Sequence, residues 1–174
     1  MATTANPTTA PLLSLLLVDL DGELASTRRV LERFPAGKGD WKPHDKSRSI
    51  GVLATHIADI PARGTSLLET DGFDFMKRTP LPNLDSPEEL VALFDERTEE
   101  LRAALAKAED GVLDQTWSLR GGDRVFITAP KRNLLRSMLV NHIIHHRAQL
   151  GVYYRLLGVP VPGVYGPTAD EPMG

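Results

Sequence analysis

The sequence predicts an all-α fold, a four-helix bundle with a small β-hairpin before the last helix. Three observations support this prediction. Apolar residues recur at helical spacing in four long segments, a capping box opens the third segment, and a Gly-Gly turn separates two short β-favouring runs just before the fourth. Four amphipathic helices in about 150 residues can enclose one hydrophobic core.

The first helix is expected over residues 12–34, where leucines recur on one face before a Pro- and Gly-containing stop. The second should begin after Ser47 or Ser49, because a serine side chain can accept a hydrogen bond from an unpaired N–H of the first turn. It should continue to Leu68 with a kink at Pro61, which removes one backbone hydrogen bond.

Residues 71–85 contain glycine, two prolines and asparagine, and are expected to form a long connection. The third helix should start at the capping box of residues 86–89 and end near Ala108. A hairpin is expected over residues 115–128, since Gly-Gly tolerates the positive φ of a tight turn. The last helix should run from Pro130 to Leu157 and stop at a glycine, so residues 130–157 form the longest helical segment.

The chain of 174 residues is therefore expected to be one domain over residues 11–174, preceded by a disordered arm over residues 1–10. It contains no cysteine, which excludes disulfides, thiolate-ligated zinc, iron–sulfur clusters and a cysteine nucleophile. A net charge of −3 argues against nucleic-acid binding. No apolar run is long enough to span a membrane, and we expect a cytoplasmic protein.

Three of the five histidines lie within residues 142–146. At 100° per residue, His142 and His146 are about 40° apart, on what should be the core-facing stripe of the last helix. This i, i+4 spacing lets a helix chelate one ion with two imidazoles. His145 lies about 60° to the other side, so the helix angles alone do not decide between His145 and His146 as the second ligand.

His56 is the natural third ligand, because it lies between apolar residues of the second helix and should point partly inward. Three imidazoles would leave a coordination position open, as in catalytic metal sites. The alternative is a core histidine whose nitrogens bond to other protein groups. No HExxH motif is present, and no ExxH motif of the di-iron carboxylate kind.

Neighbouring residues suggest supporting roles. Gln149 should face inward, where it could orient an imidazole N–H or a water, or form a hydrogen bond to another helix. Gln149 and His145 are the two candidate catalytic residues. Arg147, about 140° from His142, is expected off the core face, in an ion pair or at a dimer surface. Asp59, three residues after His56, could accept a hydrogen bond from a metal ligand or be an outer ligand itself, but is expected to be a solvated carboxylate. The far side of the last helix is unusually apolar and small, and is expected to lie at a homodimer interface, under the hairpin, or against its own chain; its residues are Val140, Ile144, Ala148 and Gly151.

The sequence resembles the DinB-like superfamily of metal-dependent enzymes over about residues 12–171. The resemblance rests on residues 41–44 (WKPH), 53–58 (LATHIA), 141–150 (NHIIHHRAQL) and 160–167 (PVPGVYGP). It implies an up-down-down-up bundle and a homodimer. It also implies a divalent metal held by three histidines, which by position are His56, His142 and His146, with His145 as their neighbour.

Relatives of this kind include low-molecular-weight thiol transferases, isomerases of thiol adducts and proteins described as hydrolases. The resemblance therefore implies a metal-dependent hydrolase or thiol S-transferase that acts on a small molecule, with a thiol as one candidate. The alternative is a non-catalytic metal-binding protein of stress response or structure. Zinc or nickel is expected first, with iron, manganese and copper as alternatives, since all of these suit imidazole ligands.

Overall fold

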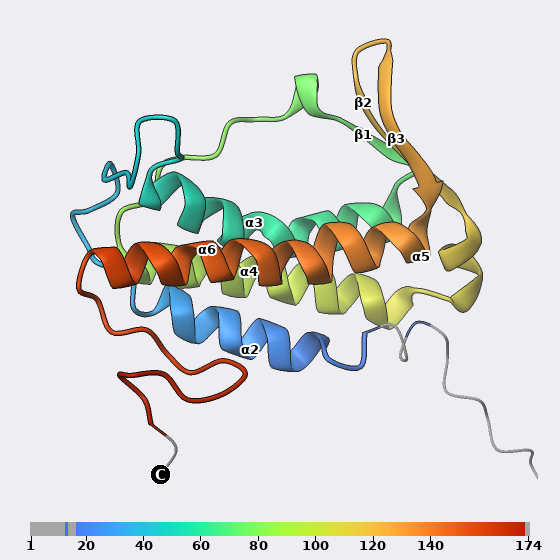
Figure 1. Ribbon diagram of the computed structural model, residues 1–174. Coiled ribbons are helices and arrows are strands. Elements are labelled where there is room, and N and C mark those ends of the chain that lie inside the picture. Colours follow the sequence, from blue (N-terminus) through green and yellow to red (C-terminus); the bar gives the residue numbers. More distant parts are fainter. Residues whose placement is uncertain (1–12, 14–16, 173–174) are drawn as a thin grey trace, which may run out of the picture.

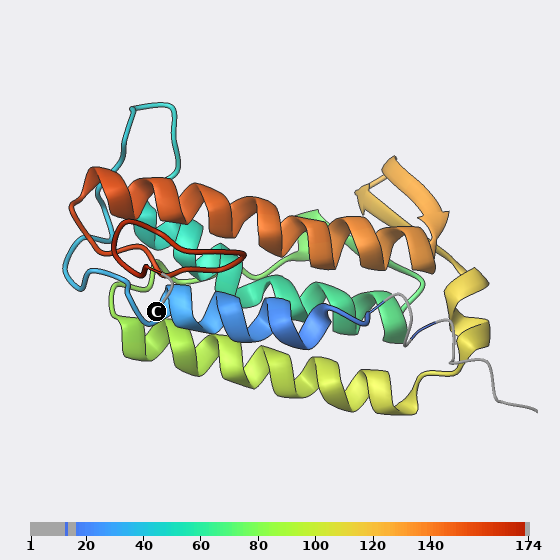
Figure 2. The same ribbon diagram turned by 60° about the horizontal axis from the view of Figure 1, so that its bottom comes forward.

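The computed structural model describes residues 13 and 17–172 and is mostly helical (Figure 1). The predicted arm over residues 1–10 lies outside the described residues, as do positions 12 and 14–16 of the predicted first helix. Four longer helices lie side by side in both views of the described chain (Figures 1 and 2): α2 (Leu20–Leu31), α3 (Ile50–Glu69), α4 (Pro87–Lys107) and α6 (Asn141–Leu156).

The other elements are short. They are β1 (Gly72–Asp74), η1 (Phe75–Lys77), η2 (Asp110–Asp114), β2 (Thr116–Gly121), β3 (Arg124–Pro130), α5 (Lys131–Leu134) and the π-helical η3 (Leu135–Val140). Among the helices that the structure describes, none combines the length and the apolar character that crossing a membrane requires.

The starts of α3 and α4 follow the sequence signals, whereas α2 is shorter than the helix predicted over residues 12–34. Ser49 caps α3, its Oγ accepting a hydrogen bond from the backbone N–H of Val52 at 3.4 Å. Ser86 caps α4 in the same way, with the N–H of Glu89 as donor at 3.2 Å, as the capping box predicts. α3 continues through Pro61. The Ser49 cap marks the start of α3, the helix that carries His56.

The sheet is larger than the predicted hairpin. β2 and β3 are antiparallel and form that hairpin, but β1 pairs with β2 in parallel and adds a third strand to the sheet. The fold prediction was therefore incomplete. The pairing depends on Gly72, where a Cβ would lie 2.6 Å from the carbonyl oxygen of Ser118. A strand of three residues is too short to show alternation in the sequence.

A π-helical segment interrupts the predicted last helix. The N–H of Asn141 donates to the carbonyl of Arg136, five residues earlier, so each residue of this segment turns the helix less than in an α-helix. The residues after it are rotated relative to those before it. The buried face of α6 is consequently not the predicted one, and consists of Ile143, Arg147, Leu150 and Tyr154.

His142 and His146 are half-buried at the edge of this face, where the straight-helix prediction placed them at its centre. Arg147, predicted off the core face, is buried with 4% of its surface exposed. Its guanidinium forms an ion pair with Glu23 of α2 at 2.6 Å and donates to the Tyr165 hydroxyl at 3.0 Å. Arg147 thus ties α6 to α2 and to the C-terminal tail, which Figure 2 shows beside them.

The predicted interface on the far side of α6 is largely covered by this chain itself. Val140 is buried, Ile144 packs against the core, and Gly151 faces Val161 of the tail; only Ala148 is exposed. The large apolar side chains that α6 does expose are Val152 and Leu156, at 59% and 61%.

Candidate metal centre

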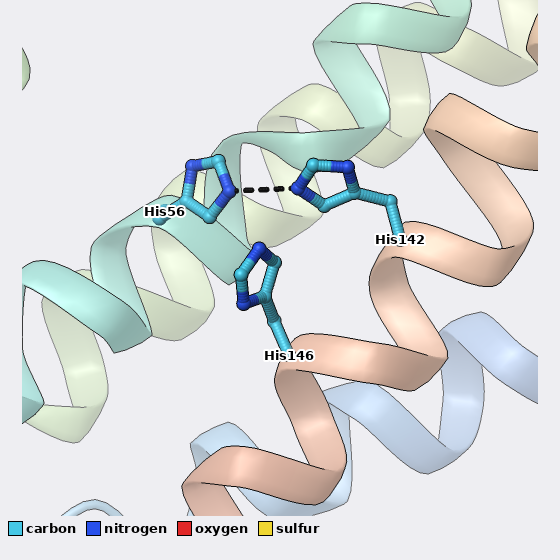
Figure 3. Close-up of side chains that lie close together, drawn as sticks. All are labelled: His56, His142 and His146. Carbon is cyan, nitrogen blue, oxygen red and sulfur yellow. Dashed lines mark hydrogen bonds between the residues drawn. The ribbon is translucent and has the colours of Figure 1, made fainter.

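Three histidine side chains from two helices point at one another. His56 of α3 faces His142 and His146 of α6, and one ring nitrogen of each turns toward a shared space (Figure 3). The Nε2 atoms of His56 and His142 are 2.9 Å apart. One potential ligand atom from each of the three residues lies within 4.8 Å of the others. The structure therefore brings together the three histidines that the sequence singles out.

Close helix packing produces this arrangement. Gly64 of α3 lies against Leu101 of α4 and Leu139 of η3, and an added Cβ would come within 2.7 Å and 2.9 Å of their side chains. Only glycine lets α3 approach this closely without displacing a neighbour. Because η3 leads directly into α6, the same contact brings the start of α6 near His56.

The site favours neutral imidazoles. Burial lowers the pKa of His56 to about 2, with a further lowering from the positive charge of Arg63 and from the two other histidines. Burial also lowers the pKa of His142 to about 4, followed by the effect of His146. The pKa of His146 is lowered by burial as well. At neutral pH all three rings are uncharged, and neutral imidazole is the form that binds metals.

Gln149 fixes the proton on His146. Its Oε1 lies 2.7 Å from Nδ1 of His146, so Nδ1 donates this hydrogen bond. Nε2 then keeps its lone pair and is the nitrogen that faces the cluster (Figure 3). Gln149 is itself exposed rather than directed inward as predicted. His145 is also exposed, with its ring centre 4.8 Å from that of His146, and it is outside the group of three.

The donor set fits a divalent transition metal. Imidazole nitrogens bound to zinc at about 2.0–2.1 Å in a tetrahedron lie roughly 3.4 Å apart. The spacings in the cluster, from 2.9 Å between His56 and His142 to at most 4.8 Å, lie on either side of that value. No carboxylate or thiolate belongs to the cluster in the part of the chain that the structure describes. Three nitrogen ligands leave coordination positions open.

A cavity of about 420 Å³ opens beside His56. The connection between η1 and α4 forms one side of it, so this segment lines the approach to the histidines. A second cavity of about 300 Å³, lined by Trp117 and Met138 among others, adjoins it, since Arg63, Arg78 and Leu81 line both.

Asp59 holds the connection in place. It is largely buried, which contradicts the predicted solvated carboxylate, and its Oδ2 accepts a hydrogen bond from Arg78 at 2.8 Å. Its Oδ1 lies 3.7 Å from Nε of Arg97. Burial raises the pKa of Asp59 despite these cations. Asp59 therefore positions Arg78 at the cavity rather than joining the histidines.

Three arginines at this cavity were not predicted from the sequence: Arg48, Arg63 and Arg78. Arg63 follows His56 by seven residues, or about two helical turns, which places both residues on the same face of α3. This spacing is the sequence signal that could have indicated an arginine near the histidines.

A mostly helical chain with three neutral histidines between two helices belongs to the class of candidate helical metalloproteins. The family model of the DinB family matches residues 3–173, and the chain belongs to this family. The resemblance noted in the sequence is confirmed. No curated protein matches the chain.

Two solved structures share the fold. A DinB-like protein from Bacillus subtilis has 21% sequence identity and a TM-score of 0.65, over 86% of this chain and 96% of the other. A DinB-like protein from Bacillus cereus ATCC 10987 has 25% identity and a TM-score of 0.64, over 86% and 95%.

Proposed function

We propose that this protein is a divalent-metal-dependent enzyme, a hydrolase or a low-molecular-weight thiol S-transferase, with His56, His142 and His146 as the metal ligands. The observation that carries the proposal is the convergence of three neutral imidazoles beside a cavity large enough for a small molecule. Zinc or nickel is the first candidate, with iron, manganese and copper as alternatives.

When bound, such an ion supplies a Lewis acid with open positions, which polarises a substrate group or lowers the pKa of a coordinated water or thiol. The chain's own residues hold and orient the ion. His56 of α3 and His142 of α6 direct their Nε2 atoms toward each other. Gln149 keeps the proton of His146 on Nδ1, so that the unprotonated Nε2 faces the other two rings.

The remaining parts of the reaction must come from outside the three histidines. The sequence has no cysteine, so any thiol in the chemistry arrives as a substrate. The amide of Gln149 does not take up a proton at neutral pH, which leaves His145 as the candidate proton acceptor near the cluster.

We further propose an up-down-down-up bundle, because α2 and α6 run in one direction and α3 and α4 in the other in Figures 1 and 2. A homodimer is proposed through the exposed apolar side of α6, where Val152 and Leu156 lie. A small-molecule substrate, the absence of nucleic-acid and membrane partners, and a cytoplasmic location are proposed from the composition.

Metal analysis followed by an activity panel tests the proposal. Purified wild type should contain close to one metal ion per chain, and His142→Ala should contain none. The loaded wild type should turn over one member of a panel of thiol-transfer and ester or amide hydrolysis substrates. A protein without stoichiometric metal contradicts the proposal. Retained metal without any turnover contradicts the enzymatic part and favours the non-catalytic alternative.

A further inference from the structure

The cavity beside His56 contains a concentration of positive charge. Its lining residues include Arg48, just before α3, Arg63 of α3, and Arg78 of the connection that follows η1. No aspartate or glutamate is among the described residues that line it, which otherwise are His56 and uncharged side chains. Three arginines therefore line a space of about 420 Å³, and among the described residues no acidic residue lines it.

Two of these three guanidinium groups have no hydrogen-bond or ion-pair partner among the described residues. Within residues 17–172, the side chains of Arg48 and Arg63 make no hydrogen bond and no ion pair, whereas Arg78 is paired with Asp59. Nε of Arg63 is buried and unsatisfied. An unsatisfied buried donor costs free energy, and such groups in folded proteins usually have a partner in a protein group, a water or a ligand.

The arginines also act on each other and on the histidines. Burial lowers the pKa of Arg63, and the nearby charge of Arg78 lowers it further, while the carboxylate of Asp59 acts in the opposite direction. Arg63 and His56 line the same cavity, so the charge of Arg63 lies near the three histidines. A bound anion would relieve the repulsion and satisfy the open donors.

We propose that Arg63 and Arg48, with Arg78 beside them, bind an anionic oxygen group of the substrate, a carboxylate or a phosphate. Guanidinium groups suit both, because their planar fork donates two parallel hydrogen bonds. Arg63 follows His56 by two turns of α3, so an anion held there places the rest of the molecule along α3 toward the three histidines. The anion site stands on the cavity alone; its role in substrate binding rests on the proposed function.

Anion titration of the full chain tests this site. Inorganic phosphate and succinate are titrated by calorimetry into chelator-treated protein, so that no metal competes for the anion. At least one should bind saturably, and the tighter of the two identifies the chemistry. Arg63→Gln should weaken this binding about 10-fold or more. Arg102→Gln is the matched control, since it removes the same charge from an exposed pair with Asp21 and should leave binding unchanged.

Arg48→Gln provides a second variant if Arg63→Gln does not fold, and it should weaken binding in the same direction. The absence of saturable binding of either anion overturns the inference, as does binding that neither arginine variant weakens. The two proposals fail separately. Metal bound through His142 without anion binding contradicts only the anion site, whereas anion binding without stoichiometric metal contradicts only the metal function.

Discussion

Arg147 should contribute more to stability than any exposed charge of α6. Its guanidinium is 4% exposed and donates to the Glu23 carboxylate at 2.6 Å, to the Glu23 carbonyl at 3.0 Å and to Thr27 Oγ1 at 3.1 Å. Arg147→Ala leaves the carboxylate of Glu23 buried without its cation. Breaking a buried ion pair from one side costs about 3–5 kcal/mol, so we expect the free energy of unfolding to fall by about that amount.

Arg155→Ala is the matched control. Arg155 belongs to the same helix, is 51% exposed, and pairs with Asp170 at 2.6 Å. Losing that pair should cost about 1 kcal/mol or less. Urea unfolding followed by circular dichroism, with chelator present so that no metal contributes, measures both variants. Equal losses for Arg147→Ala and Arg155→Ala would refute the reasoning that the Arg147 pair is what ties α6 to α2.

Three further predictions concern the histidines and the surface of α6. Gln149→Ala should weaken metal binding about 10- to 100-fold in competition with a chromophoric chelator, because His146 loses the acceptor that fixes its tautomer; unchanged affinity would argue against that role. The free energy of unfolding of the metal-stripped protein should fall as the pH falls from about 6.5 toward 4. In this range the histidines bind protons in the unfolded chain, whereas in the folded chain His56 (pKa about 2) and His142 (pKa about 4) stay largely unprotonated. Unfolding curves that coincide across this pH range would contradict the prediction. Val152→Glu should convert a homodimer to a monomer in sedimentation velocity, and a persistent dimer would place the interface elsewhere.

Signals that act over one or two turns could be predicted from the sequence. The caps Ser49 and Ser86 fix the starts of α3 and α4, because a serine hydroxyl bonds to an N–H only three residues away. The hairpin turn at Gly122 has a φ of 59°, which glycine adopts without strain. His142 and His146 lie one turn apart on α6, so their convergence depended on local geometry alone.

Features that depend on distant contacts could not be predicted in this way. The π-helical segment changes the phase of α6, so a straight helical wheel placed Arg147 outside the core. β1 pairs with β2 through residues distant in sequence, among them Gly72 and Ser118. The sequence around Arg63 does not distinguish it from a solvated charge on a helix surface. Its place at a cavity depends on the distant connection that carries Arg78.

The central claim is that His56, His142 and His146 hold one divalent ion. A crystal structure of the purified protein, with anomalous diffraction recorded at the absorption edges of zinc and nickel, tests it most directly. We predict a single anomalous peak within bonding distance of one nitrogen from each of the three rings, with His145 outside its coordination sphere. An anomalous peak bound elsewhere, or none between α3 and α6, would contradict the claim.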